Sequence, residues 1–247
     1  MSGLLLAFSW LTVLPLRGPD SVDRAAGGRA IRYAPVTGAA LGVLAAGLLW
    51  LLVSAGLNPA LGGLLTVGAL ALATRGMHID GLSDTVDGLG CYGPPERAKA
   101  VMHSGGAGPF GVCALLICLG TQALAFGSLA VAGQFGAVAV AVATGRVAVV
   151  FACRRGVPAS ANEGFGALVA ETQSWWTAFA WMVPLLAAAA WWCGPDWWHG
   201  IIVVAVTLAL SALLVAHCVR RFAGVNGDVL GAAIEITVAA SAVGFLL

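Results

Sequence analysis

Apolar residues occur along this chain in long, nearly unbroken runs, and polar residues gather in the short segments between them. Each run is close to the roughly 20 apolar residues that a helix needs to cross a bilayer. The pattern therefore predicts about seven transmembrane helices, of which the second is short and the seventh contains a carboxylate. The predicted spans are 35–56, 58–74, 109–132, 135–153, 175–193, 197–218 and 229–247.

The apolar segment that precedes these runs, LLLAFSWLTVLPL at residues 4–16, is too short for a comfortable span. It has neither a basic start nor an obvious small-residue cleavage site, which argues against a signal peptide. We predict a short interfacial or re-entrant helix at this place.

The composition agrees with a membrane protein. Hydrophobic residues make up 60% of the chain and charged residues only 9%, whereas soluble domains average about 25% charged residues. The predicted fold class is all-α, a polytopic membrane helix bundle that forms one domain over residues 1–247. Small residues at helical spacing, Gly38 and Gly42, favour close helix packing in lipid.

The expected partners follow from the same composition. No basic run suggests nucleic acid, and the lipid bilayer is the surrounding that the apolar runs predict. The six cysteines include no C-x-x-C pair and lie mostly in apolar runs, which is typical of small buried side chains rather than metal or disulfide sites. The sequence leaves a homo-oligomer open.

The charged residues are divided unequally between the connecting segments. If the spans alternate, the arginine-rich segments all fall on one side, and the opposite loops hold only Asp196 and His199 at their borders. The positive-inside rule makes the crowded side the cytoplasm. We therefore predict a multi-pass protein of the cell inner membrane with its active site facing the cytoplasm, since a transporter would place some polar groups midway through the bilayer. The arginine-rich segments are 17–32, 75–99, 154–155 and 220–221.

The segment HIDGLSDTVDG, residues 78–88, places Asp80, Asp84 and Asp87 close together. On a helix these three carboxylates share a stripe about 60° wide, and His78 points to nearly the opposite side. Neighbouring ionised carboxylates need a compensating cation, and oxygen ligands suit Mg²⁺ bound together with a substrate phosphate. Gly81 and Gly88 would leave room for a ligand. The alternative is a solvated acidic loop that binds nothing.

A second acidic pair lies far along the chain, where Asp228 and Glu235 would be only about 20° apart on a helix. An ionisable group inside an apolar run, such as Glu235, is a functional candidate, or else a protonated side chain hydrogen-bonded between helices. Because neither acidic segment contains a neutralising cation, we expect the two segments to form one site. Arg146, which also lies in an apolar run, would pair with the acidic cluster or a substrate phosphate, or with Glu235 as a structural partner.

These segments carry a resemblance to a known family. GMHIDGLSDTVDGLG is similar to the H-x-D-G-x-x-D-T-x-D-G signature of the cobalamin synthases, adenosylcobinamide-GDP ribazoletransferases, and GDVLGAAIE at 227–235 resembles their second recurring block. FSWLTVLP, PVTGAALG, TGR and EGFG give weaker similarities in the expected order over nearly the full length. One stretch departs: MHSGGAGPFG at 102–111 has Ser104 and Gly106 where the family commonly has Asp and Arg. Backbone N–H groups of this glycine-rich loop would bind phosphate, or the loop is a flexible connector.

The resemblance implies a transferase that joins α-ribazole, or its 5′-phosphate, to adenosylcobinamide-GDP with release of GMP. Adenosylcobalamin or its phosphate would be the product and Mg²⁺ the cofactor. Such a displacement mainly needs positioning and neutralisation of the leaving phosphate, and one carboxylate would orient or deprotonate the attacking hydroxyl. By this reading the metal ligands are Asp80, Asp84, Asp87 and Asp228, Glu235 joins them as a catalytic residue, and the substrate contacts are Arg146, Gly81, Gly88 and His78.

Two other functions fit parts of the pattern. A CDP-alcohol phosphotransferase shares the opening D-x-x-D-G, but Cys91 and Tyr92 stand where that signature has Ala-Arg, and its later D-x-x-x-D is missing. A cation-coupled transporter would use the aspartates as ion ligands, but the two halves of the chain show no convincing repeat.

Overall fold

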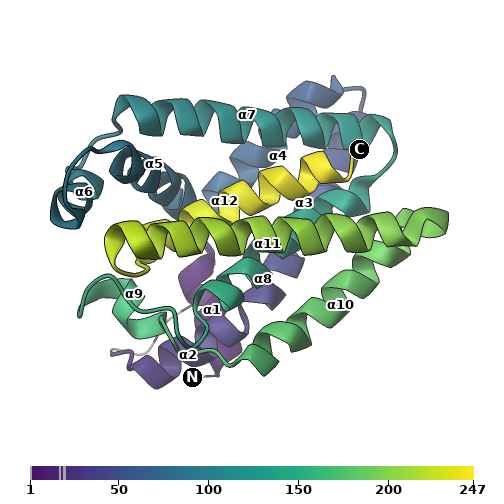
Figure 1. The fold of residues 1–247 in the computed structure, drawn as a ribbon. Coiled ribbons are helices and arrows are strands. Elements are labelled where there is room, and N and C mark those ends of the chain that lie inside the picture. The colour runs from purple at the N-terminus through teal and green to yellow at the C-terminus, as the bar shows by residue number, and fades with distance from the viewer. Residues whose placement is uncertain (1, 17, 19–20) are drawn as a thin grey trace.

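The computed structural model describes residues 2–16, 18 and 21–247, and their regular structure is helical (Figure 1). Two isolated bridges, Arg154 with Gln173 and Ala159 with Val225, are the β-type pairings of these residues. Arg17, at the start of one predicted basic segment, lies outside the described residues. The helices are α1 (Gly3–Leu11), α2 (Arg24–Arg32), α3 (Ala34–Ser54), α4 (Pro59–Ala73), α5 (Met77–Gly90), α6 (Pro95–Met102), α7 (Pro109–Val131), α8 (Phe135–Ala152), α9 (Gly164–Val169), α10 (Trp175–Cys193), the 3₁₀ helix η1 (Gly194–Asp196), α11 (Trp197–Phe222) and α12 (Gly227–Gly244).

Each predicted apolar run forms a helix, so the all-α membrane bundle is confirmed. Five helical stretches of the described residues are long and apolar enough to cross a membrane, one of them the stretch Trp175–Phe222 that joins α10, η1 and α11. A sixth is counted if α4 and α5, which meet at an angle of 95°, form one broken span. The predicted number of seven spans is therefore not confirmed. Large apolar side chains cover the outer faces of these helices, as expected for contact with lipid, among them Leu44, Leu51, Leu72, Leu116, Ile117, Val183, Trp191 and Leu213.

The N-terminal helix α1 is too short to span a bilayer and packs against α2. Leu6 and Leu11 of α1 and Ala30 of α2 form a small apolar cluster of their own, whereas Leu5 and Leu14 are exposed. Such an arrangement is compatible with the predicted interfacial helix.

The centre of the bundle is α8, most of whose side chains are buried. Gly38 and Gly42 bring α3 against it: a Cβ on Gly38 would lie 2.6 Å from Cγ of Arg146, and one on Gly42 would be 3.0 Å from Cα of Ala139. The close packing predicted for these two glycines is therefore confirmed, and Gly38 lies directly against the first carbons of the Arg146 side chain.

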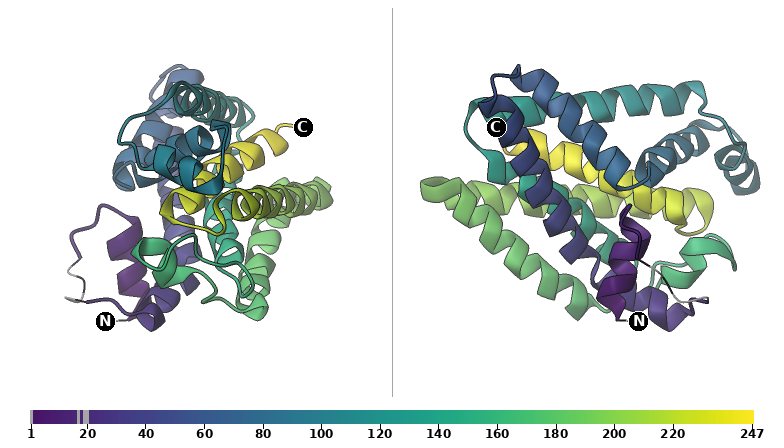
Figure 2. Two further views of the ribbon diagram at one scale, coloured as in Figure 1. Left: turned by 60° about the vertical axis from the view of Figure 1, so that its left-hand side comes forward. Right: turned by 180° about the vertical axis from the view of Figure 1, so that it is seen from behind.

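The connecting segments gather at two opposite ends of the bundle (Figures 1 and 2). The short links α3–α4, α7–α8 and α10–α11 lie at the end that holds the C-terminus. The α4–α5 bend, α6, α9 and the beginning of α12 lie at the other end, nearer the N-terminus. At the bend Arg75 and Gly76 both take left-handed backbone conformations, with φ of 57° and 69°. The polar segments thus lie together, as alternating spans predict.

Candidate active site

The site is built where α5 crosses α12. A Cβ on Gly81 would lie only 2.8 Å from Cα of Asp228, and one on Gly231 would lie 3.1 Å from Cα of His78. Such close approach of two backbones is possible only where side chains are absent. The crossing therefore brings Asp80 and Asp84 of α5 and Asp228 of α12 to the same cavity. That the two acidic segments form one catalytic site stays a prediction.

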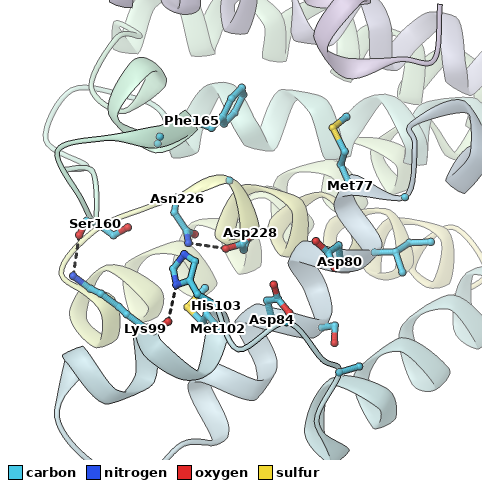
Figure 3. Close-up of a pocket in the computed structure, with 18 of the residues that line it drawn as sticks. Met77, Asp80, Asp84, Lys99, Met102, His103, Ser160, Phe165, Asn226 and Asp228 are labelled. Atoms are coloured by element: carbon cyan, nitrogen blue, oxygen red, sulfur yellow. Dashed lines mark hydrogen bonds between the residues drawn. The ribbon is translucent and has the colours of Figure 1, made fainter.

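These three carboxylates line a large cavity of about 990 Å³ at the polar end of the bundle (Figure 3). Its wall comes from the α4–α5 bend, α5, α6, the loop before α7, the segment before and within α9, and the start of α12. The acidic segments contain no cationic side chain, but other segments supply two to the cavity. These are Arg75 from the α4–α5 bend and Lys99 from α6. The cavity thus combines negative groups for a cation with positive groups for an anionic substrate.

Two polar residues of the cavity are held in defined orientations. The side chain of Asn226 caps α12 by accepting from the Val229 N–H at 3.0 Å, and its amide donates to the Asp228 carboxylate at 2.8 Å. Nδ1 of His103 lies 2.7 Å from the carbonyl oxygen of Lys99. A carbonyl only accepts, so in the neutral ring Nδ1 carries the hydrogen and Nε2 holds the free electron pair.

Asp87 does not line this cavity, although it lies on the same helix as the other two aspartates. Its two oxygens accept hydrogen bonds from the N–H groups of Gly108, at 2.7 Å, and Gly111, at 2.9 Å. Gly108 is the N-cap residue of α7 and Gly111 lies in its first turn, and a negative charge is stabilising at this end of a helix. The carboxylate is buried and both its oxygens are used in this way, which argues against the predicted role of Asp87 as a metal ligand.

The two glycines predicted to make room for a ligand make room for neighbouring helices. Gly81 meets the backbone of α12, and a Cβ on Gly88 would lie 2.5 Å from Cγ of Met102 in α6. Neither lines the main cavity. This geometry favours a role in helix packing over the predicted substrate contact.

Glu235 lies apart from the carboxylates of the cavity, in a buried polar group between helices. Its Oε2 accepts a 2.7 Å hydrogen bond from Gln122 of α7, and its Oε1 lies 3.7 Å from Nδ1 of His78. Nδ1 of His78 is in turn 3.3 Å from Nη2 of Arg146. This arrangement favours the interhelical alternative for Glu235 and argues against direct catalysis. No sequence pattern indicated Gln122 as its partner.

The donors of the main cavity fit a hard cation in chemistry. Asp80, Asp84 and Asp228 offer carboxylate oxygens, and Asp84 interacts electrostatically with the other two. Neighbouring ionised carboxylates repel each other and need a compensating cation. Within the described ranges, no three His, Cys, Asp or Glu side chains are grouped closely enough to hold a metal ion.

Comparison with known proteins decides between the enzymes and the transporter considered above. The family model for cobalamin-5-phosphate synthase matches residues 3–246. The chain belongs to the cobalamin-5-phosphate synthase family. It is thereby an enzyme of cobalamin synthesis, and the resemblance of the two acidic segments to that family is confirmed.

Curated relatives match almost the whole chain. An adenosylcobinamide-GDP ribazoletransferase of Nocardioides sp. is 40% identical, over 95% of this chain and 94% of its own length. Enzymes of the same name from Corynebacterium efficiens and Frankia casuarinae are 37% and 38% identical, over 98% and 95% of this chain and 90% and 91% of their own lengths. No solved structure matches.

Several residues of the cavity were not expected from the sequence. Lys99, His103 and Asn226 contribute side chains to it, and Gly105 and Gly106 of the divergent loop form part of its wall. The loop thus adjoins the family's acidic site although two of its side chains differ from the family pattern. Lone polar residues in connecting segments have no periodicity, so only the fold shows where they lie.

Proposed function

We propose that this member of the cobalamin-5-phosphate synthase family transfers α-ribazole, or its 5′-phosphate, to adenosylcobinamide-GDP and releases GMP. The observation that carries the proposal is the large cavity in which Asp80, Asp84 and Asp228 come together from two helices. A cavity of about 990 Å³ is at the upper end of the roughly 300–1,000 Å³ of small-molecule sites, in keeping with bulky substrates. The polar end of the bundle that contains it would face the cytoplasm of the inner membrane, by the positive-inside rule.

Mg²⁺ would be held by Asp80, Asp84 and Asp228 and would supply charge neutralisation at the pyrophosphate. The protein's own groups account for the remaining tasks. Arg75 lines the cavity and is placed to attract the anionic substrate. Lys99 donates to the carbonyl of Ser160 at 2.8 Å, which ties α6 to the segment before α9 and fixes the opposite wall.

In the transfer, the hydroxyl oxygen of ribazole forms a bond to the phosphorus on the corrinoid side, and the bond from that phosphorus to the GMP oxygen breaks. The proton of the attacking hydroxyl needs an acceptor. His103 presents the free electron pair of Nε2 because Nδ1 is committed to the Lys99 carbonyl, and it shares the cavity with the three carboxylates. We assign it the role of general base.

The direct test is transfer by the purified protein in detergent or liposomes. Adenosylcobinamide-GDP and α-ribazole with Mg²⁺ should give GMP and the joined corrinoid in equal amounts, chelation should stop the reaction, and added Mg²⁺ should restore it. Asp84→Asn is the matched inactive control. Absence of GMP release with both substrates and Mg²⁺ present would exclude the proposed activity.

A further inference from the structure

A second cavity of about 310 Å³ opens beside the main one and shares Asp80, Asp228 and Phe165 with it. It is lined by residues of α1, α2, α3, α5, α8, α9 and α12. We call it the side cavity. Its position places any occupant directly next to the carboxylates of the site.

The walls of the side cavity are mostly apolar, and its deep end is not. Trp10, Ile31, Val149 and Leu230 contribute to the walls, whereas Arg146 brings a guanidinium. Arg146 is only 3% exposed, and its Nε has no hydrogen-bond partner among the described residues. A buried donor without an acceptor is unfavourable, so an occupant that accepts a hydrogen bond there would be stabilised.

The lining of the side cavity selects the class of occupant. A phosphate would lose its hydration against the apolar walls. A purine such as guanine would leave several edge donors and acceptors unpaired against these walls. A flat, mainly apolar heteroaromatic ring with one free acceptor nitrogen would have no polar atom left unpaired, and its nitrogen would accept a hydrogen bond from Nε of Arg146.

We propose that the side cavity binds the benzimidazole base of ribazole, with Arg146 donating a hydrogen bond to its free ring nitrogen. This inference rests on the proposed function. The space corresponds to about ten water molecules at roughly 30 Å³ each, enough for two fused rings. With the base bound there, the ribose lies at the mouth beside Asp80 and Asp228, and the main cavity remains for the GDP-activated corrinoid.

The test narrows the side cavity and measures both substrates separately. Val149→Phe on α8 should raise KM for α-ribazole roughly tenfold or more, a loss of about 1.4 kcal/mol or more in binding, and leave KM for adenosylcobinamide-GDP within about twofold. Val206→Phe, the same change in a lipid-facing groove of α11, is the matched control and should alter neither. An unchanged KM for ribazole, or a rise in KM for the corrinoid substrate instead, would overturn the assignment.

A second measurement on the unaltered protein covers the case that Val149→Phe does not fold. Free 5,6-dimethylbenzimidazole should inhibit competitively against α-ribazole and not against adenosylcobinamide-GDP. 5,6-Dimethylindane, which lacks ring nitrogens, should inhibit more weakly because it leaves Arg146 without an acceptor. Equal inhibition by both compounds, or competition with the corrinoid, refutes the inference, whereas a lack of any transfer refutes the proposed function itself.

Discussion

Gly81→Ala should separate the two halves of the acidic site. The added Cβ would lie 2.8 Å from both Cα and the carbonyl oxygen of Asp228, whereas ordinary contacts begin near 3.4 Å, so α5 and α12 must move apart by about 0.6 Å. The atoms that it meets are backbone, which has no rotamer through which to yield. Overpacking of this kind costs about 1–3 kcal/mol, and a misplacement of this order among reacting groups lowers turnover roughly tenfold or more.

The measurement is GMP release per protein molecule, together with the thermal unfolding midpoint in detergent. Gly231→Ala, whose Cβ would be 3.1 Å from Cα of His78, should show a smaller loss of turnover. Gly47→Ala on the exposed face of α3, where nothing lies within 4 Å, is the matched control and should match wild-type turnover with equal or higher stability. Full activity in Gly81→Ala would refute the argument that the helix crossing sets the distance between Asp84 and Asp228.

Three further outcomes follow from the same geometry. Asp87→Asn should lower the free energy of unfolding by roughly 1–2 kcal/mol, because the N-terminal end of α7 loses a charged acceptor. The variant should keep most of its turnover, unlike Asp80→Asn, Asp84→Asn and Asp228→Asn. Equal inactivation of all four variants would restore Asp87 to the metal site. His103→Asn should lower kcat by roughly 10²-fold or more with KM values little changed, and added imidazole should recover part of the rate; an unchanged kcat would leave His103 as a cap of α6 only. In a background without the native cysteines, Pro94→Cys should react with a membrane-impermeant label only from the cytoplasmic side and Ala55→Cys only from outside, and the reverse pattern would invert the orientation.

The sequence predicts the helices well because a membrane helix must be long, apolar and bounded by turn-forming or charged residues. The pairing of the two acidic segments was also predictable, since each carries carboxylates on one helical face without a cation of its own. The 95° bend between α4 and α5 was not predictable. It arises from the left-handed backbone conformations of Arg75 and Gly76, and such a conformation is uncommon for a residue other than glycine, here Arg75. Similarly, spacing placed Asp87 on the stripe of Asp80 and Asp84 but gave no sign that the first turn of α7 would occupy it.

Asp228 and Glu235 illustrate the same limit on α12. Their separation of seven residues puts both on one face of the helix, but it also sets Glu235 about 10 Å further along the axis at 1.5 Å per residue. At the beginning of the helix Asp228 reaches the polar cavity, where water and substrate charges can solvate it. Further in, the neighbours of Glu235 come from α5, α7 and α8, and they supply Gln122, His78 and the charge of Arg146. Asp228 and Glu235 therefore lie on the same face of α12 but in different surroundings, because they lie at different depths in the bundle. The side cavity extends between these two levels, with Asp228 at its mouth and Arg146 deep within it, so a neutral ring bound there would contact the buried polar group without bringing a second negative charge toward the carboxylates.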